Sequence, residues 1–151
     1  MLWTPHATVA AIVVRDNKFL FVEETVNDQR VINQPAGHIE ENETLQEATI
    51  RETLEETGWH VEPQFLTGIY TYKAPHNGIT YYRFCYAAKA LHFDENYVID
   101  PDIARSHWLS LQELNSNLIQ LRTPLVLKCV EDFLEGARYP LDLVYEHPID
   151  A

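Results

Sequence analysis

The stretch from Gly37 to Trp59 reads GHIEENETLQEATIRETLEETGW and contains the most regular pattern of the chain. Thr44 and Glu47 have the spacing of a capping box, in which each side chain satisfies a free backbone N–H group of the first helical turn. Gly58 can adopt the left-handed conformation at low cost and is placed to end a helix. The sequence therefore predicts a helix from about Leu45 to Thr57.

Three glutamates of this helix, Glu52, Glu55 and Glu56, share one face because they occupy positions i, i+3 and i+4. Like charges at this spacing repel each other, and a bound divalent cation would reverse that cost. A solvated acidic face is the alternative interpretation. It is weakened because the helix lacks an apolar stripe and carries a threonine at every fourth position from Thr49 to Thr57. The pattern favours a metal site of carboxylate oxygens, which suit Mg²⁺ or Mn²⁺.

The spacing of this stretch resembles the signature of the Nudix hydrolase family. Gly37 is followed by five residues and Glu43, and then by seven residues and the run from Arg51 to Gly58. This order matches G-x5-E-x7-R-E-U-x-E-E-x-G-U, where U is aliphatic, at every fixed polar and glycine position. Thr53 and Trp59 replace the two aliphatic residues, and we expect this to affect local stability more than activity.

The resemblance implies a Nudix fold of the α/β class, with a mixed β-sheet sandwiched between α-helices, in one domain over residues 1–151. It also implies hydrolysis of phosphoric anhydrides with Mg²⁺ or Mn²⁺ as the cofactor. The implied metal ligands are the Gly37 carbonyl and the carboxylates of Glu52, Glu55 and Glu56. Arg51 would orient the carboxylates by charge-assisted hydrogen bonds, with a solvated helix arginine as the alternative. Glu52 and Glu55 are thus candidate catalytic residues as well as ligands.

Stretches outside the signature resemble one subgroup of the family, the NudJ-type phosphatases. The matching stretches are Pro5-His6, Val22 to Thr25, Asn33 to His38, Arg122 to Leu125 and Arg138 to Leu141. The subgroup resemblance implies removal of phosphate from nucleoside di- and triphosphates and from thiamine-related and pyrimidine-precursor diphosphates. Two alternatives stay open: a pyrophosphohydrolase of a dinucleotide or nucleotide sugar, and a catalytically silent nucleotide-binding module. Silent copies typically lose glutamates of the signature, which this chain retains.

A candidate general base lies outside the signature. Asp102, six residues before Trp108, occupies a position that resembles the loop acid of several Nudix enzymes. Such an acid binds metal or takes a proton from the attacking water, although the residue there is more often glutamate. A surface or helix-capping aspartate is an equal alternative, and Glu52 is the competing base.

Candidate substrate-binding residues are either cationic or aromatic. Arg83 interrupts an apolar and aromatic strand, where an unpaired charge is costly to bury, so it either reaches solvent or binds an anion. Arg122 could also bind phosphate or pair with a surface carboxylate. Flat side chains can stack on a heterocycle, although in strands they more often belong to the core. The candidates of this kind are Trp3, Tyr70, Tyr72 and Tyr81. His6 is a further candidate because it flanks a predicted site loop, although most such histidines are satisfied polar residues.

Side-chain alternation along strands adds an expectation about these residues. Tyr70 and Tyr72 should share one sheet face, and Tyr81 and Arg83 should share another.

The rest of the chain reads mostly as strands. Residues 6–15 and 18–24 are β-rich and flank Asp16-Asn17, which suits a hairpin turn. Further strands are predicted over 31–34, 61–72, 80–91 and near Trp108, and Pro35 is expected to end ladder pairing. A short helix is predicted over 111–118. A second helix is predicted to begin after Thr123-Pro124, which caps it, and to run to about Glu135.

Charge and composition narrow the range of partners. The net charge is −12, from 11 Lys and Arg against 23 Asp and Glu, which disfavours nucleic acid. A small phosphorylated molecule remains suitable when a bound cation supplies the positive field. Cys85 and Cys129 lack CxxC spacing and read as buried thiols. Because the sequence shows no signal peptide and no membrane-spanning stretch, we expect a cytoplasmic protein without a membrane partner. We expect a monomer, with a dimer as the alternative.

Overall fold

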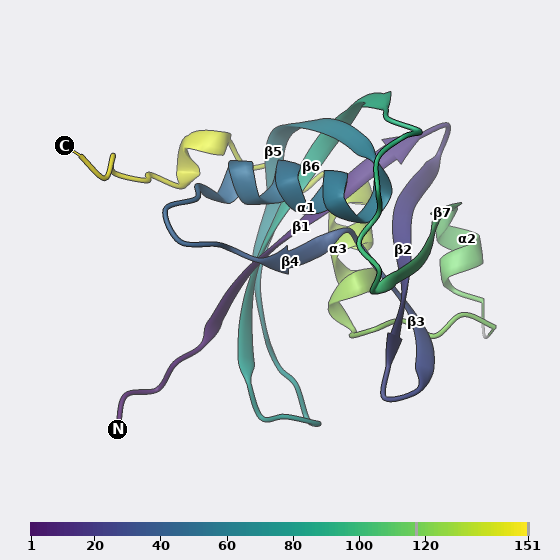
Figure 1. Ribbon diagram of the computed structural model, residues 1–151, viewed down its shortest axis with the longest axis horizontal. Helices are drawn as coiled ribbons and strands as arrows, with labels where there is room; N and C mark the ends of the chain where they lie inside the picture. Colours follow the sequence, from purple (N-terminus) through teal and green to yellow (C-terminus); the bar gives the residue numbers. More distant parts are fainter. Residues whose placement is uncertain (117, 151) are drawn as a thin grey trace.

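A seven-stranded mixed sheet forms the centre of the computed structural model, which describes residues 1–116 and 118–150 (Figure 1). The strands are β1 (His6–Arg15), β2 (Lys18–Val26), β3 (Gln29–Asn33), β4 (Ala36–His38), β5 (Trp59–Lys73), β6 (Thr80–Phe93) and β7 (Ile103–Leu109). Their order is β3-β2-β1-β6-β5, with β4 paired to β1 and β7 paired to β2. β1 runs parallel to β6, and the other pairs are antiparallel.

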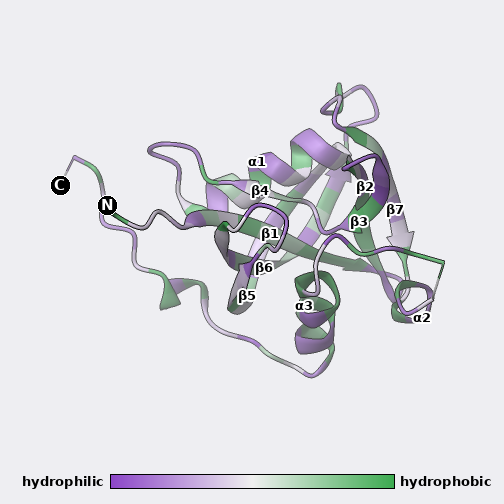
Figure 2. Cartoon of the chain, turned by 90° about the horizontal axis from the view of Figure 1, so that it is seen from below, coloured by the Kyte–Doolittle hydropathy of each residue, from purple (hydrophilic) through white to green (hydrophobic). Residues whose placement is uncertain are grey.

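Helices cover both faces of this sheet. Figure 2 shows α1 (Leu45–Thr57) above the strands and α3 (Leu125–Leu134) below them, while α2 (Leu111–Leu114) and a 3-10 turn (Leu141–Leu143) are short. The predicted α/β class, with a mixed sheet between helices, is confirmed. Within the described residues, no helix combines the length and apolar character needed to cross a membrane.

Strand β1 supplies side chains to the cores on both faces. Ala10 and Ile12 belong to the cluster that packs with α3, whereas Val9 packs with Leu45 and Ala48 of α1. Because both faces of β1 are covered, its centre reads as an unbroken apolar run instead of an alternating one.

The hairpin between β1 and β2 forms at the predicted turn. Asp16 and Asn17 have φ of 53° and 61°, as a type I′ turn requires, and Arg15 pairs with Lys18. This places the carboxyl-terminal part of β2 beside the site described below.

The prediction that Pro35 interrupts ladder pairing is confirmed, because β3 ends at Asn33 and Pro35 lies at a bend. The short strand β4, which follows directly and pairs with β1, was not predicted. Proline lacks only a donor, and the Pro35 carbonyl still accepts a hydrogen bond from the Ala11 amide at 3.0 Å. The chain therefore continues as a short strand that carries Gly37 past the middle of β1.

Other boundaries shift at exposed ends of elements. The strand predicted near Trp108 begins at Ile103, because polar residues of β7 pair with β2 at the sheet edge. The helix predicted over 111–118 ends at Leu114 with Asn115 as its C-cap, and Asn117 lies outside the described residues. The last helix is confirmed, and the Thr123 hydroxyl accepts a hydrogen bond from the Leu125 amide.

Candidate active site

Helix α1 begins and ends where the sequence predicts. The Thr44 hydroxyl accepts from the Glu47 amide, and the Glu47 carboxylate accepts from the Thr44 amide. Gly58, at φ 78°, ends the helix and donates its N–H to the Leu54 carbonyl. These local contacts fix the helix that carries the signature carboxylates.

The threonines of α1 form its packing face on the sheet. Thr49, Thr53 and Thr57 are at most 2% exposed. Each hydroxyl donates to the carbonyl four residues earlier, at 2.8, 2.7 and 2.6 Å respectively, so the buried polar groups are satisfied within the helix. The absence of an apolar stripe therefore does not leave α1 unpacked.

Arg51 contacts the carboxylates of the signature directly. Its Nε and Nη2 donate to Glu43 at 2.6 and 2.9 Å, and its Nη1 donates to Glu52 at 2.8 Å and to Glu55 at 3.2 Å. The hydrogen bond from Arg51 lowers the pKa of Glu43, and burial does not reverse this effect. With 21% of its side chain exposed, Arg51 is not the solvated arginine of the alternative interpretation, and its contacts support an orienting role.

Glu56 is the most deeply buried acid of the signature. It is 7% exposed, and its Oε1 accepts a hydrogen bond from the Ala36 amide at 3.0 Å. Burial, together with the nearby acids Glu24, Glu52 and Asp100, raises the pKa of Glu56 to about 9, although the hydrogen bond from the Ala36 amide acts in the opposite direction. A divalent cation would offset these costs, because a positive charge favours the ionised carboxylate.

Gly37 leaves the space in which the Glu52 carboxylate lies. A Cβ atom at this position would collide with the Glu52 carboxyl group, so a larger residue would displace that group from β4. Burial raises the pKa of Glu52, although its hydrogen bond from Arg51 acts in the opposite direction.

Acidic side chains from several elements line one cavity of about 350 Å³, called here the acidic cavity. The acids are Glu24, Glu40, Glu52, Glu56, Asp100 and Asp102. Glu24 and Asp100 were not predicted. Glu24 follows the buried apolar run of β2 after Glu23 and is itself buried, whereas nothing in the sequence around Asp100 marks it.

The loop before β7 brings Asp102 to the acidic cavity. The Asp100 amide donates to the Glu55 carbonyl at the end of α1, at 2.9 Å. The Asp100 carboxylate in turn accepts from the Asp102 amide at 2.9 Å. Asp100, and not Asp102, therefore provides the capping contact of this turn, and the Asp102 carboxylate remains available to the cavity.

The signature carboxylates do not form a ready-made metal site. Across residues 1–116 and 118–150, no three acidic, histidine or cysteine side chains are placed to hold a metal ion as they stand. Arg51 draws Glu52 and Glu55 to its guanidinium, while Glu56 turns to the Ala36 amide. The donor chemistry fits Mg²⁺ or Mn²⁺, and Glu52 lines the acidic cavity while it accepts from Arg51.

A second cavity of about 320 Å³, called here the arginine cavity, adjoins the acidic cavity. Residues Ala36, Gly37, His38 and Arg122 line both. The arginine cavity lies between the β2–β3 and β5–β6 hairpins, which extend on the same side of the molecule in Figure 1. A ligand can therefore extend from one cavity into the other.

The register of β5 and β6 gathers the aromatic candidates and Arg83 on one face. Tyr72 pairs with Tyr81 and Tyr70 pairs with Arg83, and paired residues project to the same side of a sheet. The expectation that the two pairs occupy different faces is therefore wrong. Tyr72, Tyr81 and Arg83 line the arginine cavity, whereas Tyr70 is buried and donates to Asp132 of α3 at 2.8 Å.

The two candidate arginines have different partners. Arg122 forms an ion pair with Glu24 where the two cavities meet. Arg83 is 7% exposed and donates to the amide oxygens of Gln34 and Asn33, at 2.7 and 3.0 Å.

The remaining two candidates lie at or beyond the margin of the cavities. His6 Nδ1 lies 2.9 Å from Nε2 of His38, and the His6 ring contacts Tyr81 edge-on. Burial lowers the pKa of His38, which lines both cavities. Trp3 is 66% exposed and packs edge-on against Tyr82 outside both cavities, so the structure does not bring it to the site.

Comparison with known proteins agrees with the fold and the signature. A model of the NUDIX domain matches residues 4–128. Phosphatase NudJ of Escherichia coli (strain K12) is 38% identical over 143 residues, which cover 95% of this chain and 92% of the relative. The NUDIX hydrolase from Nitrosomonas europaea matches with a TM-score of 0.93 and 41% identity, over 97% of this chain and 99% of that chain.

A UDP-X diphosphatase shares the fold with a TM-score of 0.74 and 20% identity, over 93% of this chain and 68% of that chain. The match of the domain across most of the sequence and the relatives near 40% identity lead to one conclusion: this chain belongs to the Nudix hydrolase family.

Proposed function

We propose that this Nudix hydrolase removes phosphate from small diphosphate and triphosphate metabolites with the help of Mg²⁺ or Mn²⁺. The substrates would include nucleoside phosphates and thiamine-related and pyrimidine-precursor diphosphates. The observation that carries the proposal is the junction of the acidic and arginine cavities at Gly37, His38 and Arg122. A phosphate group at this junction would meet both the carboxylate cluster and an arginine, while the rest of the substrate occupies the arginine cavity.

The cation would be held by Glu52, Glu55, Glu56 and the Gly37 carbonyl. When bound, it would neutralise phosphate charge and lower the pKa of the attacking water. Arg51 positions Glu52 and Glu55 through its hydrogen bonds.

The other residues at the junction act on the substrate and the water. Arg122, held by Glu24, donates to phosphate oxygens. Asp102 accepts the proton of the water, since its carboxylate faces the cavity without serving as the cap of its own loop.

The relative named Phosphatase NudJ supports phosphate removal over cleavage inside a dinucleotide or nucleotide sugar. We extend the proposal to a single-domain, cytoplasmic monomer. Cys85 and Cys129 are both free and buried, as suits a reducing compartment.

A substrate screen with and without Mg²⁺ tests the proposal by detecting orthophosphate and identifying the second product. Orthophosphate plus a monophosphate from nucleoside or thiamine-type diphosphates is the expected result. A nucleoside monophosphate plus a second phosphorylated product, from dinucleotides or nucleotide sugars alone, would favour the pyrophosphohydrolase instead. The absence of metal-dependent turnover on every compound would refute both.

A further inference from the structure

Arg83 is a buried cation without an acidic partner. No aspartate or glutamate in residues 1–116 and 118–150 forms an ion pair with it, and neutral amide oxygens of Gln34 and Asn33 hold its guanidinium. Burying an unpaired charge is unfavourable unless further hydrogen bonds compensate it. The arrangement therefore indicates that a ligand completes the surroundings of Arg83.

The amides around Arg83 have a fixed orientation. An arginine only donates hydrogen bonds, so Gln34 and Asn33 must direct their oxygens toward it. Gln34 is fully buried, and its Nε2 donates to the Val126 carbonyl of α3 at 2.7 Å, which locks this side chain. Arg83 also lines the arginine cavity, and its guanidinium carries more N–H groups than the two amides accept from. Such donors select hydrogen-bond acceptors.

Arg83 and Arg122 differ in the cavities that they line. Arg122 lines both cavities, whereas Arg83 lines the arginine cavity and not the acidic one. A substrate with its phosphates at the junction therefore presents phosphate oxygens to Arg122 and its opposite end to Arg83.

Flat side chains border the space beside Arg83. Tyr81 precedes Arg83 by two residues on β6 and pairs with Tyr72 of β5, so both rings share its face. The Tyr81 hydroxyl accepts from Asn77 at 3.0 Å, and its ring contacts His38 edge-on, which restricts the plane of the ring. Walls of this kind suit a flat ring more than a phosphate group.

We propose that Arg83 is a specificity-determining residue that binds acceptor atoms on a heteroaromatic ring at the end of the substrate remote from the phosphates. The ligand class is a planar ring with nitrogen or carbonyl-oxygen acceptors on its edge, joined to a diphosphate by a short link. The inference rests on the proposed function for the position of the diphosphate, whereas binding of the ring itself does not require hydrolysis.

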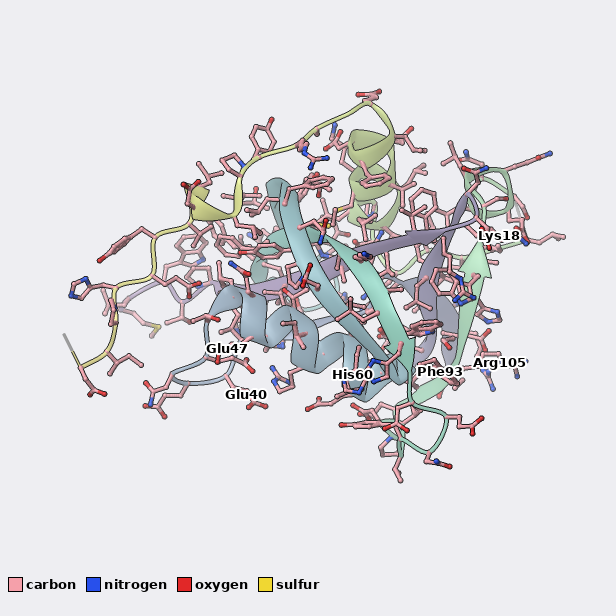
Figure 3. All side chains as sticks on the ribbon, turned by 90° about the horizontal axis from the view of Figure 1, so that it is seen from above. Lys18, Glu40, Glu47, His60, Phe93 and Arg105 are labelled. Atoms are coloured by element: carbon pink, nitrogen blue, oxygen red, sulfur yellow. The ribbon has the colours of Figure 1, made fainter. Side chains whose placement is uncertain are left out.

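Two diphosphates of matched shape test this assignment: pyrimidin-5-ylmethyl diphosphate, whose ring has nitrogen acceptors, and benzyl diphosphate, whose ring has none. The wild type should favour the first in kcat/KM by about 10-fold or more, as expected for hydrogen bonds from a charged donor. Arg83→Gln should lower kcat/KM for the pyrimidine compound by about 10-fold to 100-fold and leave the benzyl compound within about threefold. Arg105→Gln is the matched control, since Arg105 is an exposed arginine on β7 outside both cavities (Figure 3).

A second measurement is independent of turnover. NMR titration in EDTA compares the ring alcohols, 5-(hydroxymethyl)pyrimidine and benzyl alcohol, in the wild type and in Arg83→Gln. The pyrimidine alcohol should bind more tightly to the wild type and lose that advantage in the variant. If the wild type shows this preference but hydrolyses no diphosphate, the ring assignment stands and only the proposed function is rejected.

Two results would overturn the assignment. Equal losses for both diphosphates in Arg83→Gln would place a phosphate, and not the ring, at Arg83. Equal binding of the two alcohols by the wild type would also reject the ring assignment. Because this comparison uses the wild type alone, it remains valid even when Arg83→Gln does not fold.

Discussion

Helices α1 and α3 cover opposite faces of one sheet but bury different chemistry. The buried side chains of α3 are Val126, Cys129 and Val130, and apolar burial explains their presence. Besides Leu45 and Ala48, the buried side of α1 carries a column of threonines and Glu56, whose ionisation is disfavoured there. The contrast indicates that α3 is built for stability, whereas α1 accepts a local cost that a bound cation would offset.

The largest effect is expected from the buried acid of α1. Glu56→Gln should lower kcat by at least about a hundredfold, because a charged ligand of the cation is lost. Steady-state assays of phosphate release measure this effect. Glu131→Gln, which removes an exposed glutamate from α3, is the matched control and should stay near wild type. Activity of Glu56→Gln within a fewfold of wild type would refute the ligand assignment.

The two candidate bases should respond differently to the cation concentration. Asp102→Asn should lower kcat by about a hundredfold while the Mg²⁺ dependence changes little, if Asp102 takes the proton of the water. Glu52→Gln should weaken Mg²⁺ binding as well, so high Mg²⁺ should partly restore its turnover. Titrations of kcat against Mg²⁺ distinguish the two.

Either of two outcomes changes this assignment. Full activity of Asp102→Asn would remove that residue from the mechanism. Failure of high Mg²⁺ to restore any turnover in Glu52→Gln would move the role of base to Glu52.

The opposite pattern is expected for α3. Val130→Ala should lower the free energy of unfolding by about 2 kcal/mol, because buried methyl groups are lost and a cavity remains. Val130 is 0% exposed and lines neither cavity, so kcat should change by less than about twofold at temperatures where the variant is folded. Urea unfolding and kinetics on the same sample check this. A large fall in kcat at unchanged stability would show that α3 takes part in the site.

A smaller effect on stability is expected from pH in the absence of metal. The pKa of Glu56 in the folded protein, about 9, lies above its ordinary value of 4.5, so between these values the folded state keeps a proton that the unfolded state has lost. Stability should therefore fall as pH rises through this range, by up to about 1.4 kcal/mol per pH unit. Urea unfolding in EDTA at about pH 6 and about pH 8 measures the slope, which Glu56→Gln should reduce. Parallel slopes in the two proteins would exclude Glu56 as the cause.

Local signals explain why some of this architecture could be predicted from the sequence. Thr44, Glu47 and Gly58 act within a few residues of each other, and the predicted bounds of α1 are the observed ones. Asp16-Asn17 likewise determines the first hairpin by its own backbone preference. The signature carboxylates could be grouped because one helix carries them all.

Long-range contacts explain the failures. The pairing of β4 with β1 depends on residues far apart in the chain, so the short strand after Pro35 was not predicted. The cross-strand register that unites Tyr72, Tyr81 and Arg83 is also invisible in β alternation alone. Asp100 reaches the acidic cavity only because its loop is bound to the end of α1.

The most direct test of the central claim is thermal unfolding with increasing Mg²⁺ or Mn²⁺, because it does not depend on turnover. The wild type and Glu131→Gln should become more stable as the cation is added, by about 2.7 kcal/mol at a hundredfold excess over Kd. Glu56→Gln should lose most of this cation-dependent rise in Tm. An equal rise in Glu56→Gln and in the wild type would contradict the claim that α1 buries Glu56 for a cation.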